Sequence, residues 1–274
     1  MRLVTWNIQW CRGMDGRVDP ERIARLARER YDPDVVCFQE VGVNYPDLGA
    51  PHDQPALLAA AFPGYSAHFA AAVDTRDESG ARKRFGNMIL SRLPVQQVFR
   101  HSLPWPPQAD VPNMPRVAVE AVVEAPFGRV GVMTTHLEFY SQLQRAAQVE
   151  RLIELKAEAL AHSTRQAVPK QKDSGPFTPF PRAASSILTG DFNMRPEDSL
   201  VARLSSVWQD AWNAANPGAP QPPTFGVFDR EFAREPYCCD FVFVSDDLAG
   251  RVAGARVDLQ NQASDHQPVI VEFR

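Results

Sequence analysis

The sequence predicts an α/β (α+β) fold in which many strands pack as a sandwich and helices lie outside it. Short apolar runs typical of buried strands alternate with helical patterns along the whole chain. The 274 residues are 44% hydrophobic, which is enough to bury a sizeable core. No internal repeat, linker or heptad pattern divides the chain. We therefore expect a single domain over residues 1–274.

The N-terminal elements carry clear local signals. An apolar strand is expected at residues 3–8. Asp19 then precedes Pro20, which is the pattern of a helix N-cap followed by proline at the first helical position, and the helical stripe continues to Tyr31. The next run, residues 35–38, is apolar on both faces, which is typical of a buried strand.

The rest of the chain continues this alternation of strands and helices. A helix is expected over residues 54–62, and Ser141 is the expected cap of a long helix whose apolar positions run to Leu160. The further strands that we expect are residues 65–73, 86–90, 95–103, 117–123, 129–135, 186–189, 240–244, 251–257 and 269–273.

Three loops surround this framework. Residues 74–84 are charged and are expected to be mobile, whereas residues 42–55 carry no signature of a function. Residues 164–184 form a connection that is long for a compact domain, so they are expected to be either disordered or a lid that faces the substrate.

Composition excludes several classes of protein. A formal net charge of −4 argues against a large surface for non-specific phosphate binding, but it allows a local basic pocket. No apolar stretch approaches the roughly 18–20 residues of a membrane span, and the first residues lack the pattern of a signal peptide. We therefore expect a cytoplasmic protein with no integral membrane association. No protein partner can be inferred.

The four cysteines have neither metal-ligand spacing nor the character of a disulfide framework. Cys37 lies in an apolar run and is expected to be a buried thiol. The vicinal pair Cys238 and Cys239 directly precedes Asp240, so oxidation there could disturb a site.

Polar residues follow nearly every core strand, where they can reach a cleft. Alone, each is weak evidence of function, because a glutamate at a strand end is usually solvated and Gly-Asp-Phe-Asn is compatible with an ordinary turn. As an ordered set they indicate a site, and the set consists of Asn7, Glu40, His136, Asp191, Asn193, Asp240, Asp265 and His266.

These motifs, in this order, resemble those of the endonuclease/exonuclease/phosphatase superfamily of metal-dependent phosphoesterases. The segment Gly-Asn-Met-Ile-Leu-Ser at residues 86–91 belongs to the same pattern, and the resemblance covers essentially the whole chain. It implies a four-layer sandwich in which two packed mixed β-sheets are flanked by helices.

Phosphate-ester hydrolysis needs a hard cation, donors for the phosphoryl oxygens and a base for water. Glu40 and Asp265 are hard oxygen ligands suited to Mg²⁺, with Mn²⁺ as a possible substitute, and the amide oxygen of Asn7 adds a third ligand. Thiolate or multi-histidine ligation, which would indicate zinc, is absent from the pattern. We expect magnesium.

The resemblance also implies catalytic roles. Asp191 would orient or deprotonate the attacking water, and Asn193 would position that water or bind a phosphoryl oxygen. His266 would contact the phosphate while Asp240 accepts its other ring proton. Whether this His–Asp pair supplies the base instead stays open. His136 would be a second phosphate contact or a proton donor to the leaving group.

Two further residues are tentative. Arg116 resembles a family position that faces the cleft, and it is open between a substrate phosphate contact and a surface ion pair. Asn87 is open between a contact with the substrate phosphate and an indirect hydrogen-bonding role, of which the second is favoured. His68, His101 and His162 match no motif and are expected to be structural or exposed.

The function predicted from these residues is Mg²⁺-dependent hydrolysis of a phosphodiester or phosphomonoester by in-line attack of water. The substrate is a nucleic acid, a phosphorylated small molecule or a lipid headgroup. A non-specific nuclease is the alternative, for which the basic cluster at residues 82–84 is a weak hint. A non-catalytic scaffold would have lost part of the site, yet no expected ligand is missing.

Overall fold

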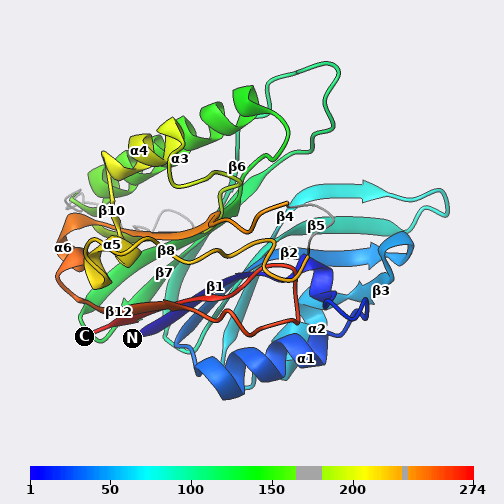
Figure 1. Cartoon of the computed structure of the whole chain (residues 1–274), viewed down its shortest axis with the longest axis horizontal. Coiled ribbons are helices and arrows are strands. Elements are labelled where there is room, and N and C mark those ends of the chain that lie inside the picture. Colours follow the sequence, from blue (N-terminus) through cyan, green and yellow to red (C-terminus); the bar gives the residue numbers. More distant parts are fainter. Residues whose placement is uncertain (165–180, 230–233) are drawn as a thin grey trace, which may run out of the picture.

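The computed structural model describes residues 1–164, 181–229 and 234–274. Two mixed β-sheets pack face to face, and helices cover the outer face of each (Figure 1). This arrangement confirms the predicted four-layer sandwich. Within the described residues, no helix is long and apolar enough to cross a membrane.

The first sheet has seven strands in the order β12-β13-β1-β2-β5-β4, with β3 paired to β2. Its strands are β1 (Arg2–Asn7), β2 (Val35–Tyr45), β3 (Ala50–Asp53), β4 (Ser66–Arg76), β5 (Arg82–Ser91), β12 (Val252–Val257) and β13 (Val269–Phe273).

The second sheet has six strands in the order β10-β11-β9-β8-β7-β6. Its strands are β6 (Val95–Ser102), β7 (Val117–Ala125), β8 (Gly128–His136), β9 (Ser185–Asp191), β10 (Gln209–Asp210) and β11 (Asp240–Val244).

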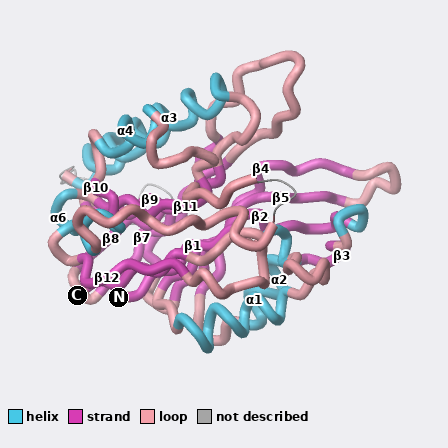
Figure 2. The backbone as a smooth tube through the Cα atoms, in the orientation of Figure 1, coloured by secondary structure: helices cyan, strands magenta, loops and turns pink. Residues whose placement is uncertain are grey.

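Helices form the two outer layers, as Figure 2 shows along the backbone. Helices α1 (Pro20–Leu26) and α2 (Gln54–Ala61) cover the first sheet, whereas α3 (Gln142–Ser163) and α4 (Ser199–Ser205) cover the second. The predicted caps are present, because Asp19 accepts from the backbone of Arg22 and Ser141 from that of Gln144. The remaining short helices are Gln9–Cys11, Ala27–Tyr31, Pro46–Leu48, α5 (Ala211–Ala215) and α6 (Asp246–Ala249).

The hydrophobic core has three parts that correspond to the interfaces between layers. Leu3 and Val35 of the first sheet meet Val119 and Val132 of the second in the central part. The second part lies between the first sheet and α1 and α2, and the third lies beneath α3 and α4. Burial of apolar surface on both faces explains why these strands read as continuous apolar runs.

The charged segment 74–84 was wrongly expected to be a mobile loop. Strand β4 continues to Arg76 and β5 begins at Arg82, so these residues form a regular hairpin. Asp74 stands opposite Arg84 in the ladder and forms an ion pair with Arg82, its diagonal neighbour nearer the tip. The charges that suggested a loop therefore stabilise the cross-strand pairing.

The short elements were missed because they have too few residues to show a period. Helices α4, α5 and α6 and strand β10 lie in segments to which the sequence assigned no structure, and β2 and β3 occupy most of the loop expected at residues 42–55. Residues 165–180 of the expected lid lie outside the described residues.

The strand directions bring the polar strand ends to one edge of the sandwich. Strand β1 is parallel to β2, and β8 is parallel to β9, so the carboxyl ends of β1, β8 and β9 meet there. Strands β11 and β13 run antiparallel to β9 and β1, and they therefore begin at the same edge. This topology predicts that side chains far apart in the sequence converge.

Candidate active site

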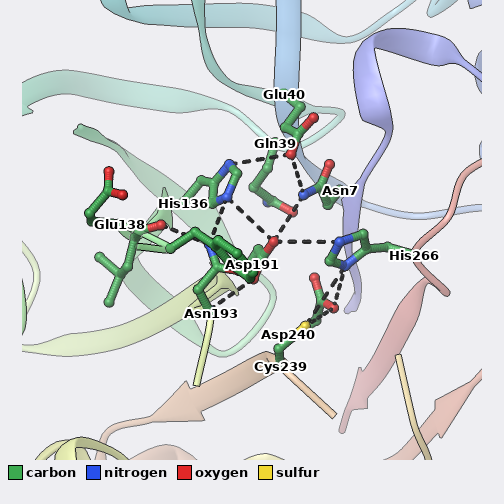
Figure 3. A network of polar contacts seen from close by, with 12 residues as sticks. Asn7, Gln39, Glu40, His136, Glu138, Asp191, Asn193, Cys239, Asp240 and His266 are labelled. Atoms are coloured by element: carbon green, nitrogen blue, oxygen red, sulfur yellow. Dashed lines mark hydrogen bonds and ion pairs between the residues drawn. The ribbon is translucent and has the colours of Figure 1, made fainter. Parts of the chain in front are cut away.

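Eight polar residues from both sheets converge at this edge, and Figure 3 labels all of them except Asp265. Asn7, His136 and Asp191 are the last residues of β1, β8 and β9, and Asp240 is the first residue of β11, paired across the ladder with Asp191. The segment that precedes β13 supplies His266. The structure therefore brings together the set of residues that the sequence predicted.

Glu40 reaches the site through a β-bulge. The register between β2 and β5 shifts between Phe38 and Val41, and Glu40 lies within this irregularity with a left-handed φ of 59°. Bulges of this kind redirect a side chain out of the strand's regular alternation. A left-handed backbone at a non-glycine residue costs free energy, which is typical of functional positions.

The turn after β9 depends on a glycine. Gly190 has a φ of 139°, and a Cβ atom built there would lie 1.9 Å from the carbonyl oxygen of Thr135 on the neighbouring strand β8. Only glycine allows β8 and β9 to approach so closely at this point. Asn193 follows with a left-handed φ of 52°, and its N–H donates to Asp191 Oδ1 at 2.9 Å.

Asp191 lies at the centre of the network. Its Oδ2 accepts a hydrogen bond from Asn7 Nδ2 at 2.9 Å. The same oxygen lies 3.6 Å from Nε2 of His266 and 3.5 Å from Nε2 of His136. The carboxylate is 1% exposed, and Figure 3 shows the two imidazoles on opposite sides of it.

His266 forms the predicted pair with Asp240, whose Oδ2 lies 2.9 Å from His266 Nδ1. Burial acts to lower the pKa of His266, but the carboxylates of Asp240 and Asp191 outweigh it and raise this pKa well above its usual value. This shift favours the protonated imidazole, whose Nδ1 faces Asp240 and whose Nε2 faces Asp191.

His136 has the opposite protonation state. Burial, and then the charge of Arg116, lower its pKa to about 3, so the ring is neutral. The amide nitrogen of Asn193 donates both to Leu137 O and to His136 Nε2, each at 2.9 Å. Because Nε2 accepts, the single ring proton must be on Nδ1, which has no hydrogen-bond partner among the described residues.

This arrangement makes a spectroscopic prediction. In protein with ¹⁵N-labelled histidine, His136 is expected to show the neutral Nδ1–H tautomer throughout pH 5–8, whereas His266 shows two protonated nitrogens near neutral pH. Two-dimensional ¹H–¹⁵N spectra assigned with His136→Gln and His266→Gln variants would measure this. A protonated His136 at pH 7 would contradict the assignment.

Glu40 and Asp265 form an anionic pocket beside Asp191. Burial, and then repulsion from Asp265, raise the pKa of Glu40 to about 7. Burial also raises the pKa of Asp265. Buried carboxylates that repel one another are stabilised when a cation neutralises them. Their chemistry therefore fits a hard divalent ion.

The orientation of Asn7 differs from the expectation that its amide oxygen faces a cation. That oxygen accepts from the backbone N–H of Gln9 at 3.1 Å. The amide nitrogen donates instead to Glu40 Oε1 at 3.0 Å and to Asp191. Asn7 thus bridges the carboxylates of Glu40 and Asp191 through its amide nitrogen. Its amide oxygen is not directed at a cation because it accepts the N–H of Gln9 in the turn after β1.

Cys239 also lies at the site, which the spacing of the cysteines did not indicate. Its Sγ is 3.5 Å from Asp240 Oδ2 and 4.0 Å from His266 Nδ1. Donor atoms of Asp191, Cys239 and His266 lie within 4.8 Å of one another, so a thiol is within reach of a metal here. Burial and neighbouring carboxylates raise the pKa of this thiol well above its usual value, which disfavours the thiolate.

The two tentative residues are both buried. Arg116 forms an ion pair with Glu138 at 3.1 Å, but the pair is buried rather than on the surface, and Arg116 Nη1 has no partner among the described residues. Asn87 donates to the carbonyl oxygen of Val117 at 2.9 Å and so joins the two sheets. This contact favours the indirect hydrogen-bonding role for Asn87 over a contact with phosphate.

Two contributors to the site were missed. Glu138 is fully buried and accepts from Arg116 Nε and from the backbone of Tyr140. Tyr237 packs its ring against Phe225, whose ring in turn lies against that of His266. Glu138 follows the histidine motif by two residues, which was an available signal, whereas nothing in the sequence marks Tyr237.

Comparison with solved structures supports the fold. A protein described as an endonuclease/exonuclease/phosphatase from Beutenbergia cavernae is 27% identical, with a TM-score of 0.70 over 100% of this chain and 71% of that one. A mannosyl-6-phosphatase from Bacteroides thetaiotaomicron is 18% identical (TM-score 0.67, covering 100% and 99%). TDP2 from Caenorhabditis elegans is 19% identical (TM-score 0.63, covering 99% and 96%).

The last two structures are less than 25% identical to this chain, so they show similarity of fold alone. No curated protein matches the chain by sequence. The profile of the endonuclease/exonuclease/phosphatase family, however, matches residues 4–266, a span that includes every residue of the site described above. The chain therefore belongs to the endonuclease/exonuclease/phosphatase family and is a hydrolase.

Proposed function

We propose that the chain hydrolyses a phosphate ester by attack of a water molecule that Asp191 deprotonates, with Mg²⁺ held by Glu40 and Asp265. The observation that carries this proposal is the position of the Asp191 carboxylate between two imidazoles, with Oδ2 3.6 Å from Nε2 of His266 and 3.5 Å from Nε2 of His136. Opposite protonation states around one carboxylate are typical of acid–base sites.

The cation contributes one kind of chemistry. When bound, Mg²⁺ neutralises charge on the phosphoryl oxygens and makes the ester a better electrophile. Glu40 and Asp265 are the oxygen donors that would hold it, and the hydrogen bond from Asn7 orients Glu40. Mn²⁺ has similar ligand preferences and is the expected substitute.

Side chains and backbone groups of the chain supply the base for water and the donors for the phosphoryl oxygens. Asp191 accepts the proton of water while Asn7 and the backbone of Asn193 hold its two oxygens. Nε2–H of His266 is a fixed donor for a phosphoryl oxygen, and such a donor is effective because the site is largely excluded from water. Nδ1 of His136 lies 3.8 Å from Glu40 Oε1 and so faces a proposed ligand of the cation.

The protonation of His266 bears on the identity of the base. A protonated imidazole has no lone pair with which to accept a proton from water, and Asp240 keeps it protonated. The role of base is therefore assigned to Asp191, and His266 acts as an electrostatic donor. A neutral His136 likewise serves as a hydrogen-bond donor rather than as a strong acid.

The non-specific nuclease is less well supported. The basic cluster at residues 82–84 was its main hint, and each member is paired with an aspartate: Arg82 with Asp74, Lys83 with Asp47 and Arg84 with Asp53. Paired charges on a hairpin leave little net attraction for a nucleic-acid backbone.

The test is turnover with Mg²⁺ or Mn²⁺ across a panel of phosphate esters. The panel contains bis-p-nitrophenyl phosphate, p-nitrophenyl phosphate, single- and double-stranded DNA, RNA, sugar phosphates and sphingomyelin. We expect hydrolysis of at least one ester that disappears with EDTA and with Asp191→Asn. Hydrolysis that persists in either case would refute the proposal.

Glu40→Ala is expected to weaken metal binding specifically. The Mg²⁺ concentration for half-maximal activity should rise by about tenfold or more, because the anionic pocket loses one of its two carboxylate donors. Titration of activity against Mg²⁺ measures this.

Cys239→Ala is the matched control for the metal prediction, since Cys239 lies beside His266 but is not among the proposed oxygen ligands. Its Mg²⁺ dependence should equal that of the parent protein. A shift for Cys239→Ala with none for Glu40→Ala would place the ion among Asp191, Cys239 and His266 instead.

A further inference from the structure

A cavity of about 700 Å³ opens directly beside the catalytic centre. Its volume is typical of small-molecule sites, which measure roughly 300–1,000 Å³. Asn193, whose amide contacts His136, belongs both to the catalytic network and to the cavity wall. The other lining residues are Met194, Arg195, Glu197, Asp198, Arg234, Glu235 and Tyr237.

The charges of this cavity disfavour an anionic occupant. Among the described lining residues, two arginines face three carboxylic acids, so these side chains carry a formal net charge of −1 at neutral pH. A second phosphate group, or the continuing backbone of a nucleic acid, would be repelled by Glu197, Asp198 and Glu235. A neutral polar group would meet both hydrogen-bond donors and acceptors.

One face of the Tyr237 ring, the aromatic group of the cavity, is already covered. The guanidinium of Arg195 lies 4.1 Å from the centre of the Tyr237 ring, so it covers one face. Phe225 packs edge-to-face against the same ring at 5.4 Å. A nucleobase would have to displace Arg195 before it could stack on that face. The charged and polar side chains of the lining favour hydrogen bonding over the stacking of a planar ring.

We propose that the cavity binds the alcohol part of the substrate and that this part is a neutral polyhydroxylated group, such as a sugar or polyol carrying one phosphate. This inference rests on the proposed phosphoesterase function. Glu197 and Glu235 accept hydrogen bonds from hydroxyl groups, and Arg195 donates to hydroxyl or ring oxygens. Hydrogen bonds that involve a charged partner are stronger than neutral ones and suit a hydroxylated group.

The inference predicts a substrate preference, and it predicts that variants of the cavity affect a sugar phosphate but not p-nitrophenyl phosphate. With Mg²⁺, kcat/KM for hexose monophosphates should exceed that for p-nitrophenyl phosphate and for a dinucleotide. Glu197→Ala and Arg195→Ala should each lower kcat/KM for the hexose phosphate by about tenfold, mainly through KM, because the lost contacts bind substrate and transition state alike. Neither should change kcat/KM for p-nitrophenyl phosphate, which lacks hydroxyl groups. Glu29→Gln, on the opposite helix layer, is the control and should behave as the parent protein.

The outcomes distinguish the two proposals. If p-nitrophenyl phosphate is hydrolysed in an Asp191-dependent manner but hexose monophosphates are no better, or a sugar bisphosphate or single-stranded DNA is better, the assignment of this cavity is wrong. If no ester is hydrolysed in an Asp191-dependent manner, the proposed function itself fails. Equal losses on p-nitrophenyl phosphate and on the sugar phosphate in Glu197→Ala would also overturn the assignment.

Discussion

Asp191→Asn is expected to lower kcat by about 10³-fold or more while leaving the fold intact. A general base contributes roughly 10²–10⁴-fold to such reactions, and asparagine has the same shape but cannot accept the proton. The substitution also removes a negative charge that helps to keep His266 protonated. Both effects act in the same direction, so the loss should lie toward the upper end of this range.

Steady-state kinetics on the best ester of the panel would measure the loss, and thermal unfolding would test the fold. Asp191→Asn removes the repulsion of Glu40 but also the attraction to His266, so the unfolding temperature should change little. Asp246→Asn, an exposed acid on α6, is the matched control and should retain full activity. Near-normal turnover in Asp191→Asn would remove Asp191 from the role of base.

His266→Ala is the substitution with the second largest expected effect. Loss of a fixed charged donor to the phosphoryl group should lower kcat by about 10²–10³-fold. Because Phe225 packs against this ring at 4.7 Å between ring centres, alanine also leaves a cavity, and some stability should be lost with the activity. The kinetic effect must therefore be separated from the structural one.

Asp240→Asn makes that separation, because it retains the shape of the side chain and should preserve the backbone hydrogen bond to Thr224. Without this carboxylate the pKa of His266 falls, since burial, which lowers it, is no longer fully opposed. The protonated form is then lost at a lower pH. The alkaline limb of the activity profile should move to lower pH, whereas an unchanged profile would show that the charge of His266 is not needed.

Most of the fold could be predicted from the sequence because both sheets are buried on two faces. Strands such as β9 and β11 read as short apolar runs bounded by polar residues, and Ser141 marks the start of α3 unambiguously. The extension of β4 and β5 beyond the predicted strands could not be foreseen, because their charged tip is stabilised by pairs between strands rather than by a local pattern. Short helices such as α5 have too few residues to show a period.

For the site, the sequence indicated which residues to group but not how they are oriented. Residues at strand ends, such as His136 and Asp191, follow from strand length and topology. The bulge at Glu40, the rotated amide of Asn7 and the buried pairing of Arg116 with Glu138 depend on contacts between distant segments. Such contacts leave no signature in spacing, and the approach of Cys239 to His266 is of the same kind.

The division of the site between the two sheets has a kinetic consequence. Asn7, Glu40 and His266 belong to the first sheet or the loop beside it, whereas His136 and Asp191 belong to the second. Neither sheet alone carries a base together with both imidazoles. During refolding, therefore, a species in which only one sheet has formed is inactive. The return of enzymatic activity reports the docking of the two sheets. Secondary structure should return first, with catalysis following as a separate and later phase.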